Sequence, residues 1–467
     1  MTVSWESSLY GVEGAPVEAR EHRELARRMR FDSIGKRVLL SKPGRTTMAL
    51  IQTAPIGKSR SMKRHMDWRR SVRLNLQRSS PEAAAALVMI FEYIETARRR
   101  MYYHFLRAAT ARVSIVRPAT RGFRSCRGAL AHTAGRKPRL FFMGTDLQQD
   151  SCGLLQSLER VFDLQVFHRA DGTYGLFSPH NSRRFDGDRL NYHTILESLA
   201  RLQDEGWVPD IILFQGLPEY LSAGTLRLLR ERTRALLINL GMDDRHACVI
   251  GLHAGELRGT LGYVGVVDLA LTAAKEFVGL FRSWGLDSLY IPEASDPHVF
   301  HPVPVQQDID VLFVGRNYGY RSKLIEAISY GGWRIECFGR GFSNGMIDFS
   351  RINELYNRAK IVLGASYILA SRNWTSLKLR DFDVPMSGAF YLTSFSPELA
   401  ELYDDGNEIA MYRNITELRR LVALYLGNGG LRSKIARAGQ ERAARCHTWD
   451  QRFLGVREYL VSGGVPK

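Results

Sequence analysis

Two pairs of a glycine and an arginine stand where apolar, strand-like runs end in the second half of the sequence. They are Gly315-Arg316 and Gly339-Arg340. A glycine at the end of a strand lets backbone N–H groups come close to an anion, and a neighbouring arginine supplies positive charge. Each pair is therefore a candidate phosphate ligand, although a glycine in this place also serves as a plain tight turn. Arg321, which opens the following helix, is a lesser candidate of the same kind.

Two further cations, Lys378 and Arg380, precede Asp383 at the expected start of a helix. The positive end of the helix dipole lies there, so acidic side chains are favoured and basic ones are not. The two cations are therefore hard to explain by helix stability alone. We interpret them as ligands of a diphosphate group.

Side chains that can accept a proton or bind a hydroxyl lie nearer the middle of the sequence. Asp146 follows one strand-like run, Asp243 and Asp244 follow another, and His253 lies in a glycine-rich loop. Each is a candidate catalytic residue. Each also has a structural interpretation: a helix cap for Asp146, turn residues for the pair, and a solvated loop residue for His253. The sequence leaves both interpretations open.

The sequence lacks the motifs that are typical of several other enzyme classes. The chain contains no Walker, HExxH or GxSxG motif, and its histidines and cysteines do not cluster at metal-ligand spacing. The five cysteines are scattered, with no CxxC pair, which argues against a disulfide framework and fits a cytoplasmic compartment. We expect no metal and no resident cofactor.

The net charge of +17 is confined to the N-terminal part of the chain. Residues 1–137 contain 28 Lys and Arg against 10 Asp and Glu, whereas residues 138–467 contain 37 against 38. A protein that grips a nucleic-acid backbone along its whole length would spread its cations over the fold. The distribution therefore argues against nucleic acid as a partner.

The basic extension, residues 1–137, contains one expected helix at 81–112. The second half of this helix mixes arginines with aromatic and aliphatic residues, a composition that suits a helix lying on an anionic membrane surface. We expect peripheral membrane contact through residues 60–137, while the alternative is an extension whose helix packs on the main body. No apolar run near it approaches the roughly 20 residues of a spanning helix.

Short apolar runs alternate with helical patterns after this extension. They lie at 140–144, 164–169, 209–216, 235–241, 266–273 and 288–294, and then at 310–315, 333–339, 360–366, 388–394 and 408–412. This alternation predicts two α/β domains, each a doubly wound, Rossmann-like parallel sheet, at 138–305 and 306–467. Ligands of such sheets bind beyond the carboxyl ends of the strands, so we expect the two loop edges to face a common cleft.

The C-terminal half carries a series of short motifs in a fixed order. They are LRDFD at a helix start, SG before the strand AFYLTS, PEL, GNEI, ARAG and HTWDQR. In this order they resemble the CgeB-type (spore maturation protein-like) group 1 glycosyltransferases. IPEASDPHVFHP resembles the joint between the domains of that family, and LINLGMDD resembles a strand of its N-terminal domain. The resemblance covers about 138–460.

The resemblance implies a GT-B glycosyltransferase without an obligatory metal. The C-terminal domain would hold a nucleotide-sugar, UDP- or GDP-linked, and the N-terminal domain would hold a glycan, a lipid-linked glycan or another hydroxyl acceptor. Asp383 stands where the family has a glutamate that contacts ribose, and Thr375 stands where many GT-B enzymes have a second glutamate. The alternative is a non-catalytic protein of the same fold that binds a nucleotide or glycan within a larger assembly.

Overall fold

The computed structural model describes residues 125–464, apart from 178–183, 217, 219, 246–251, 254–255, 258 and 369–374. The expected helix at 81–112 and most of the basic extension lie outside these residues, together with the expected membrane contact. The described residues all belong to one compact unit of the chain. No helix among them is long and apolar enough to cross a membrane.

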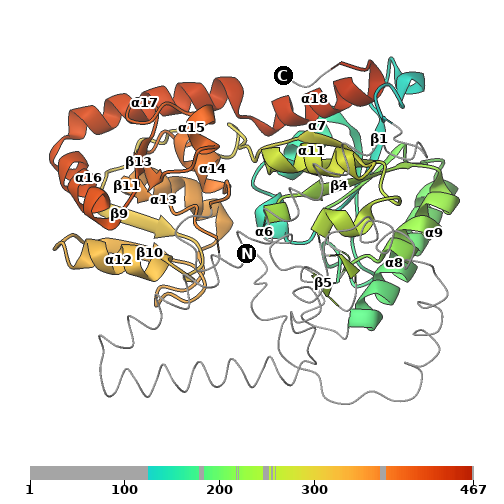
Figure 1. The fold of residues 1–467 in the computed structure, drawn as a ribbon, viewed down its shortest axis with the longest axis horizontal. Helices are drawn as coiled ribbons and strands as arrows, with labels where there is room; N and C mark the ends of the chain where they lie inside the picture. Colours follow the sequence, from blue (N-terminus) through green and yellow to red (C-terminus); the bar gives the residue numbers. More distant parts are fainter. Residues whose placement is uncertain are drawn as a thin grey trace, which may run out of the picture. The chain divides into compact units, whose positions relative to one another are not determined.

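Two parallel sheets organise the described residues (Figure 1). The first has six strands in the order β2-β1-β3-β4-β7-β8, with every neighbouring pair parallel. Its strands are β1 (Arg139–Met143), β2 (Asp163–Val166), β3 (Ile211–Phe214), β4 (Leu236–Gly241), β7 (Leu269–Thr272) and β8 (Asp287–Tyr290). The chain passes from β1 to β2 on one side and returns to β3 on the other, so a switch point lies between β1 and β3.

Helices and one short hairpin connect these strands. The helices are α6 (Leu147–Asp150), α7 (Leu154–Val161), α8 (Arg184–Asp204), α9 (Ala223–Thr233) and α11 (Lys275–Ser283), with 3-10 turns η1 (Ala131–Thr133) and η2 (Gly259–Tyr263). The hairpin pairs β5 (Leu252–His253) with β6 (Glu256–Leu257) in antiparallel fashion.

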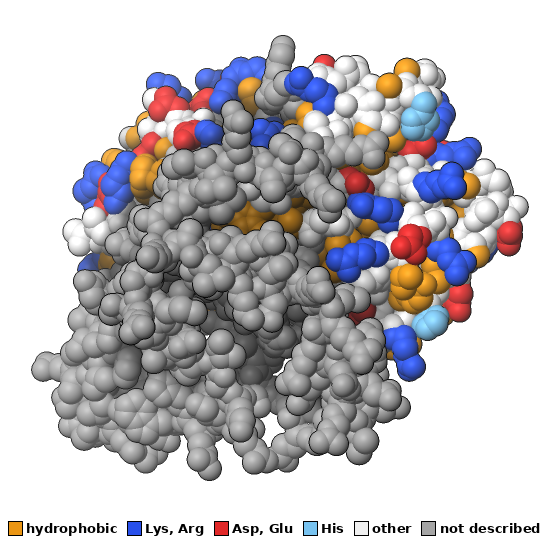
Figure 2. All heavy atoms as spheres, turned by 45° about the vertical axis from the view of Figure 1, so that its right-hand side comes forward, with side chains coloured by type: hydrophobic (Ala, Val, Ile, Leu, Met, Phe, Trp, Pro, Cys, Tyr) orange, Lys and Arg blue, Asp and Glu red, His pale blue; other side chains and the backbone are white. Residues whose placement is uncertain are grey.

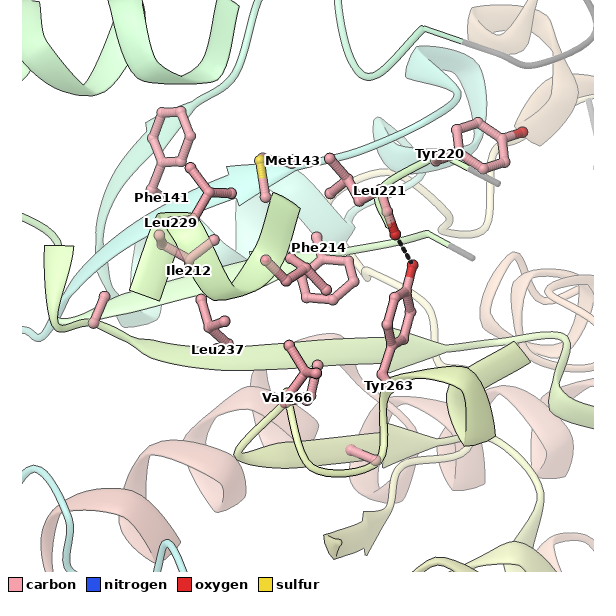
Figure 3. Close-up of a cluster of buried hydrophobic side chains, with 14 of the residues drawn as sticks. Phe141, Met143, Ile212, Phe214, Tyr220, Leu221, Leu229, Leu237, Tyr263 and Val266 are labelled. Carbon is pink, nitrogen blue, oxygen red and sulfur yellow. Dashed lines mark hydrogen bonds between the residues drawn. The ribbon is translucent and has the colours of Figure 1, made fainter. Parts of the chain in front are cut away.

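Side chains of the first sheet pack in separate cores on its two faces. Phe141 and Met143 of β1 belong to one cluster, while Leu140 and Phe142 belong to the other. This alternation is what a strand buried on both faces requires. Figure 3 shows the first cluster, in which side chains from β1, β3, β4 and α9 meet, and the Tyr263 hydroxyl donates to a backbone carbonyl oxygen at 3.0 Å.

The second sheet has five parallel strands in the order β10-β9-β11-β12-β13. They are β9 (Ile309–Val314), β10 (Ile335–Phe338), β11 (Ala359–Leu363), β12 (Tyr391–Ser394) and β13 (Ala410–Tyr412). The helices around them are α12 (Arg321–Ser329), α13 (Ile352–Arg358), α14 (Arg380–Met386), α15 (Leu399–Leu402), α16 (Ile415–Gly427), α17 (Gly429–Cys446) and α18 (Trp449–Val461), with a 3-10 turn η3 (Phe349–Arg351). Here too the buried side chains of β9 alternate between two clusters.

Each strand of the two sheets coincides with an apolar run expected from the sequence, and the predicted fold class is confirmed. We expect no element from the sequence at α6, α8, α11, α15 or the β5–β6 hairpin. Helix α8 has a weak apolar periodicity, α6 and α15 are only four residues long, and the hairpin strands are only two residues long, whereas α11 has a clear apolar face that was missed. Patterns this short or weak do not stand out from loops.

Helix α18 belongs to a different core from the one that the sequence suggests. The expected C-terminal domain, 306–467, includes this helix, but its side chains Trp449, Phe453 and Leu460 lie in a core cluster of the first sheet and pack against α7. The Trp449 N–H also donates to Ser295 O, and the Ser295 N–H donates to His447 O, each at 3.0 Å. The last helix therefore joins the two halves, and the exact domain boundaries remain a prediction.

Charge on the described surface is mixed in sign. Figure 2 shows one face, on which Lys and Arg side chains of the described residues are interspersed with Asp and Glu. This agrees with the near balance of 37 cationic and 38 acidic residues counted over 138–467.

Candidate functional site

The loops that follow β9, β10 and β11 form the candidate site. In the second sheet the chain passes from β9 to β10 on one side and crosses to β11 on the other. The carboxyl ends of β9 and β11 therefore mark the switch point, where ligands of such sheets bind.

Gly315 and Gly339 pack the ends of β9 and β10 tightly together. Their φ angles are 148° and 128°, a backbone region that side chains rarely adopt. A Cβ on Gly339 would overlap the Gly315 carbonyl, and a Cβ on Gly315 would overlap the Arg380 guanidinium. Their own N–H groups donate to Phe338 O at 2.8 Å and Gly345 O at 2.7 Å. The two glycines thus provide close approach, and their N–H groups are used within the protein.

The guanidinium of Arg380 lies at this edge. Its Nη1 donates to Val314 O, the last carbonyl of β9, and the group lies over the Phe313 ring at 5.0 Å. Its Nε and Nη2 are buried and have no hydrogen-bond partner among the described residues. A buried cationic donor without a partner is costly, so this arrangement favours an anion at the site.

Arg321 is a second buried guanidinium at the same edge. It is only 4% exposed, and it donates to Arg316 O at 2.8 Å and to Ala365 O at 3.4 Å. Its Nε has no hydrogen-bond partner in the described part of the chain. Burial, together with the nearby Arg380, lowers the pKa of Arg321 to about 10, so it still carries its charge at neutral pH. Arg340 is exposed and is more open than either of these arginines, whereas Arg316 is half-buried like Arg380.

Like Arg380, whose charge acts on Asp381 and Asp383, Lys378 lies near acids. Its Nζ lies 3.9 Å from Oδ1 of Asp243, which belongs to the loop after β4 of the first sheet. Its backbone N–H donates to Asp381 Oδ2 at 2.8 Å, so a buried aspartate in the first turn of α14 satisfies the helix start. The cation expected to oppose the helix dipole is thus offset by an acid in the same turn.

Asp383 is buried beside Ser295, a residue of the segment that connects the two sheets. Burial raises the pKa of its carboxyl well above the ordinary value, and its Oδ1 has no hydrogen-bond partner among the described residues. Glu293 of the same segment is also buried, and burial raises its pKa while the charge of Lys378 lowers it. A cluster of buried acids therefore lies behind Lys378.

Asp244 is a structural residue of the loop after β4. It is 3% exposed, and its carboxylate accepts hydrogen bonds from Thr260 Oγ1 at 2.7 Å and Thr272 Oγ1 at 2.6 Å. Burial raises the pKa of Asp244 to about 6, and the two hydroxyls partly oppose that shift. This carboxylate fixes the loop to β7 and η2, whereas Asp243 is half-exposed.

The remaining candidates of the first half are Asp146 and His253. Asp146 caps α6 by accepting from Gln148 N at 3.0 Å, as one of its two interpretations anticipated. His253 lies in β5, and its side chain is outside the described residues. Asp243 is therefore the acidic candidate that the structure brings to the second sheet.

Sequence reasoning missed a buried polar pair at the switch point of the first sheet. The Tyr174 hydroxyl donates to Asp150 Oδ2 at 2.6 Å, and burial raises the pKa of Asp150 to about 6. Gly144, which follows β1, leaves room for the pair, because a Cβ there would overlap both side chains. A lone aspartate two residues before a cysteine carries no pattern that could have pointed to this role.

The comparisons with known proteins bear on the half of the chain that contains this site. Residues 316–458 match the family described as Glycosyl transferase-like. The match begins directly after Gly315 at the end of β9 and ends within α18, so it covers most of the second sheet and less than half of the chain. No curated protein matches the chain. Within the described residues, no group of three or more His, Cys, Asp and Glu side chains is arranged to hold a metal ion.

Among solved structures, similarity is spread over both sheets but is distant. A sucrose-phosphate synthase from Thermosynechococcus elongatus has 14% identity and a TM-score of 0.47, with 71% of this chain and 90% of that chain covered. HepE from Anabaena, solved with UDP-glucose, has 11% identity and a TM-score of 0.47, with 70% and 100% covered. A glycosyltransferase from Rickettsia africae has 10% identity and a TM-score of 0.45, with 71% and 100% covered. No residue role is transferred from proteins this distant.

Proposed function

We propose that this protein transfers a sugar from a UDP- or GDP-linked donor to a hydroxyl of a glycan, a lipid-linked glycan or a similar acceptor, without a metal ion. One observation carries the proposal. Nε and Nη2 of Arg380 and Nε of Arg321 are buried without a hydrogen-bond partner among the described residues, at the carboxyl edge of the second sheet and inside the region that matches the glycosyl transferase-like family. We also propose that the chain is of the CgeB type, on the motif order described above.

In this proposal the two arginines stabilise the negative charge that develops on the leaving nucleoside diphosphate. Preorganised cationic donors in a water-poor site act strongly on developing charge and need no reorganisation during the reaction. Arg316, which is half-buried, and Arg340, which is exposed, would hold the outer phosphate oxygens. Gly315 and Gly339 serve the site by letting the loops approach closely.

Asp243 is the proposed catalytic acid–base or orienting residue for the acceptor hydroxyl. It is half-exposed and lies 3.9 Å from Lys378 at the meeting point of the two halves. A carboxylate in this place can accept a proton or a hydrogen bond from a hydroxyl. The ribose contact that the family resemblance implies for Asp383 stays a prediction, and its buried place suggests support of the site from behind.

Donor binding and turnover test this proposal together. Wild type is incubated with UDP-, GDP- and TDP-sugars, and both thermal stabilisation and nucleotide release are measured. Arg380→Met should abolish the response, whereas the control Arg358→Met should retain it, because Arg358 pairs with Asp308 at the opposite, amino end of β11. If no nucleotide stabilises the wild type, the transferase proposal is wrong.

The alternative is a non-catalytic protein of the same fold. It is favoured by the replacement of the family's glutamate by Asp383, whose carboxyl is buried. Stabilisation by a nucleotide that depends on Arg380, without release of nucleotide in the presence of a panel of glycan acceptors, would support it.

We further propose that residues 60–137 contact an anionic membrane surface, on their sequence composition alone. Reversing the charge of Arg69, Arg70, Arg98, Arg99 and Arg100 should weaken sedimentation with vesicles that contain phosphatidylserine. Undiminished sedimentation of this variant would refute the contact.

A further inference from the structure

We propose that Arg245 is a positioning residue that holds the catalytic loop of the first half against the donor half, an inference that rests on the proposed function. Neither the family motifs nor the candidate residues above include Arg245. It is the residue directly after Asp243-Asp244, and it contacts both halves of the molecule.

Arg245 makes a three-way contact that spans the two halves. Its Nε and Nη2 donate to the two carboxylate oxygens of Glu276 in α11, both at 2.6 Å. Its Nη1 pairs with Glu398 Oε2 at 2.7 Å and donates to Thr375 O at 3.2 Å, and both of these residues belong to the donor half. The side chains of Arg245 and Glu398 are only 15% and 9% exposed.

The loop that carries Arg245 is firmly anchored in its own half. Asp244 ties it to Thr260 and Thr272 through buried hydrogen bonds, as described above. Because the middle residue of the loop is fixed, its neighbours on either side are presented in a fixed geometry. Asp243 then reaches Lys378, and Arg245 reaches Glu398 and Thr375.

The partners of Arg245 lie on the segment that leads into the donor site. Thr375 stands three residues before Lys378 and five before Arg380. The same segment is held on the donor side, where Ser376 N donates to Ser366 O at 2.9 Å beyond the end of β11. Arg245 therefore fixes the distance between the Asp243 loop and a segment that is itself anchored to the donor sheet.

This contact is expected to matter for chemistry more than for donor binding. Arg380 is held by Val314 O and Phe313, and Arg321 by carbonyls of its own half, so neither needs Arg245. The alignment of acceptor and donor does need it, and a misplacement of about 1 Å between reacting groups can cost roughly 100-fold in rate.

A neighbouring ion pair supplies a matched control. Lys275 of α11 and Glu401 of α15 also join the two halves, at 2.5 Å, but each side chain is 59% exposed. Exposed pairs contribute little, whereas removing one partner of a buried pair leaves an uncompensated charge. Lys275→Met should therefore leave activity unchanged.

The experiment compares Arg245→Met, Arg245→Lys and Lys275→Met with wild type, with the donor that wild type prefers. We expect Arg245→Met to lower kcat by about 100-fold while the Kd of the nucleotide stays the same. Hydrogen exchange of peptides containing 241–245 and 375–378 should become faster. Arg245→Lys should recover only part of kcat, because lysine keeps the charge but cannot make the planar fork to Glu276.

Glu398→Gln provides the second route if Arg245→Met does not fold. It removes the partner in the donor half and leaves the Arg245–Glu276 pair in place, so it should lower kcat in the same direction by a smaller factor. An unchanged kcat with unchanged hydrogen exchange in both variants would overturn the inference, and so would a loss of nucleotide affinity equal to the loss of kcat. If wild type binds no nucleotide, the proposed function fails, while hydrogen exchange still shows whether Arg245 joins the halves.

Discussion

The carboxyl edges of the two sheets differ in whether buried cationic groups accompany the buried acids. At the first sheet, Asp150 and Asp244 are buried acids that accept hydrogen bonds from hydroxyls of their own half. At the second sheet, the buried acids Asp381 and Asp383 lie near Arg380, and guanidinium N–H groups of Arg321 and Arg380 are buried without a hydrogen-bond partner among the described residues. A hydrogen-bonded acid stabilises a loop, whereas a cation with unsatisfied donors favours an anion. We therefore propose a structural role for the two acids of the first sheet and nucleotide binding for the two arginines.

The largest expected effect comes from removing both cations. In the double variant Arg321→Met/Arg380→Met, nucleotide affinity should fall about 1,000-fold, because each charge-assisted hydrogen bond contributes roughly 1.5–3 kcal/mol. Isothermal titration with UDP or GDP, whichever wild type binds, measures this loss. The control Arg432→Met, which removes an arginine of α17 that donates to backbone carbonyls in the last turn of α16, should bind normally. Equal losses in both variants would mean that the arginines only support the fold.

A smaller effect should appear in the pH dependence of stability at the first sheet. Burial raises the pKa of Asp244 from 3.8 to about 6, so the folded state binds its proton more tightly than the unfolded state does. Its contribution to the free energy of unfolding is complete below about pH 4 and is lost as the pH rises through about 6. This pH-dependent contribution amounts to at most about 3 kcal/mol of the free energy of unfolding, and Asp244→Asn should remove it.

Urea unfolding at a series of pH values measures this change. The control is Asp308→Asn. Because Arg358 lowers the pKa of Asp308, loss of the Asp308 carboxyl should change the slope of unfolding free energy against pH in the opposite sense. If Asp244→Asn reproduced the wild-type slope, the carboxyl would not be the buried, proton-binding group described here.

The smallest effect on binding concerns Lys378. Because its charge is already offset by Asp243, 3.9 Å away, and by the buried Glu293, Lys378→Met should affect nucleotide binding little. Nucleotide affinity should fall less than it does in Arg380→Met, as titration of the two variants side by side would show. A larger loss of nucleotide affinity for Lys378→Met than for Arg380→Met would mean that Lys378, and not Arg380, is the main ligand of the nucleotide.

Two neighbouring aspartates show why the sequence predicts only part of the candidate site. Asp243 and Asp244 are adjacent and look equivalent in the sequence, yet one faces the donor half and the other is buried under two threonine hydroxyls. Consecutive residues in a loop point in different directions, so spacing cannot separate their roles. Arg245, one position further, carries no motif at all.

The sequence by itself determined the two series of strands, the order of the motifs and the confinement of positive charge to residues 1–137. These depend on hydrophobic periodicity and composition, which are local properties of the chain. Only the tertiary structure decided that α18 packs on the first sheet, that Arg380 rather than Lys378 keeps N–H groups without a partner, and that Arg245 bridges to Glu398. Burial and pairing between residues more than 100 positions apart depend on how the two sheets meet, and no local pattern encodes that meeting.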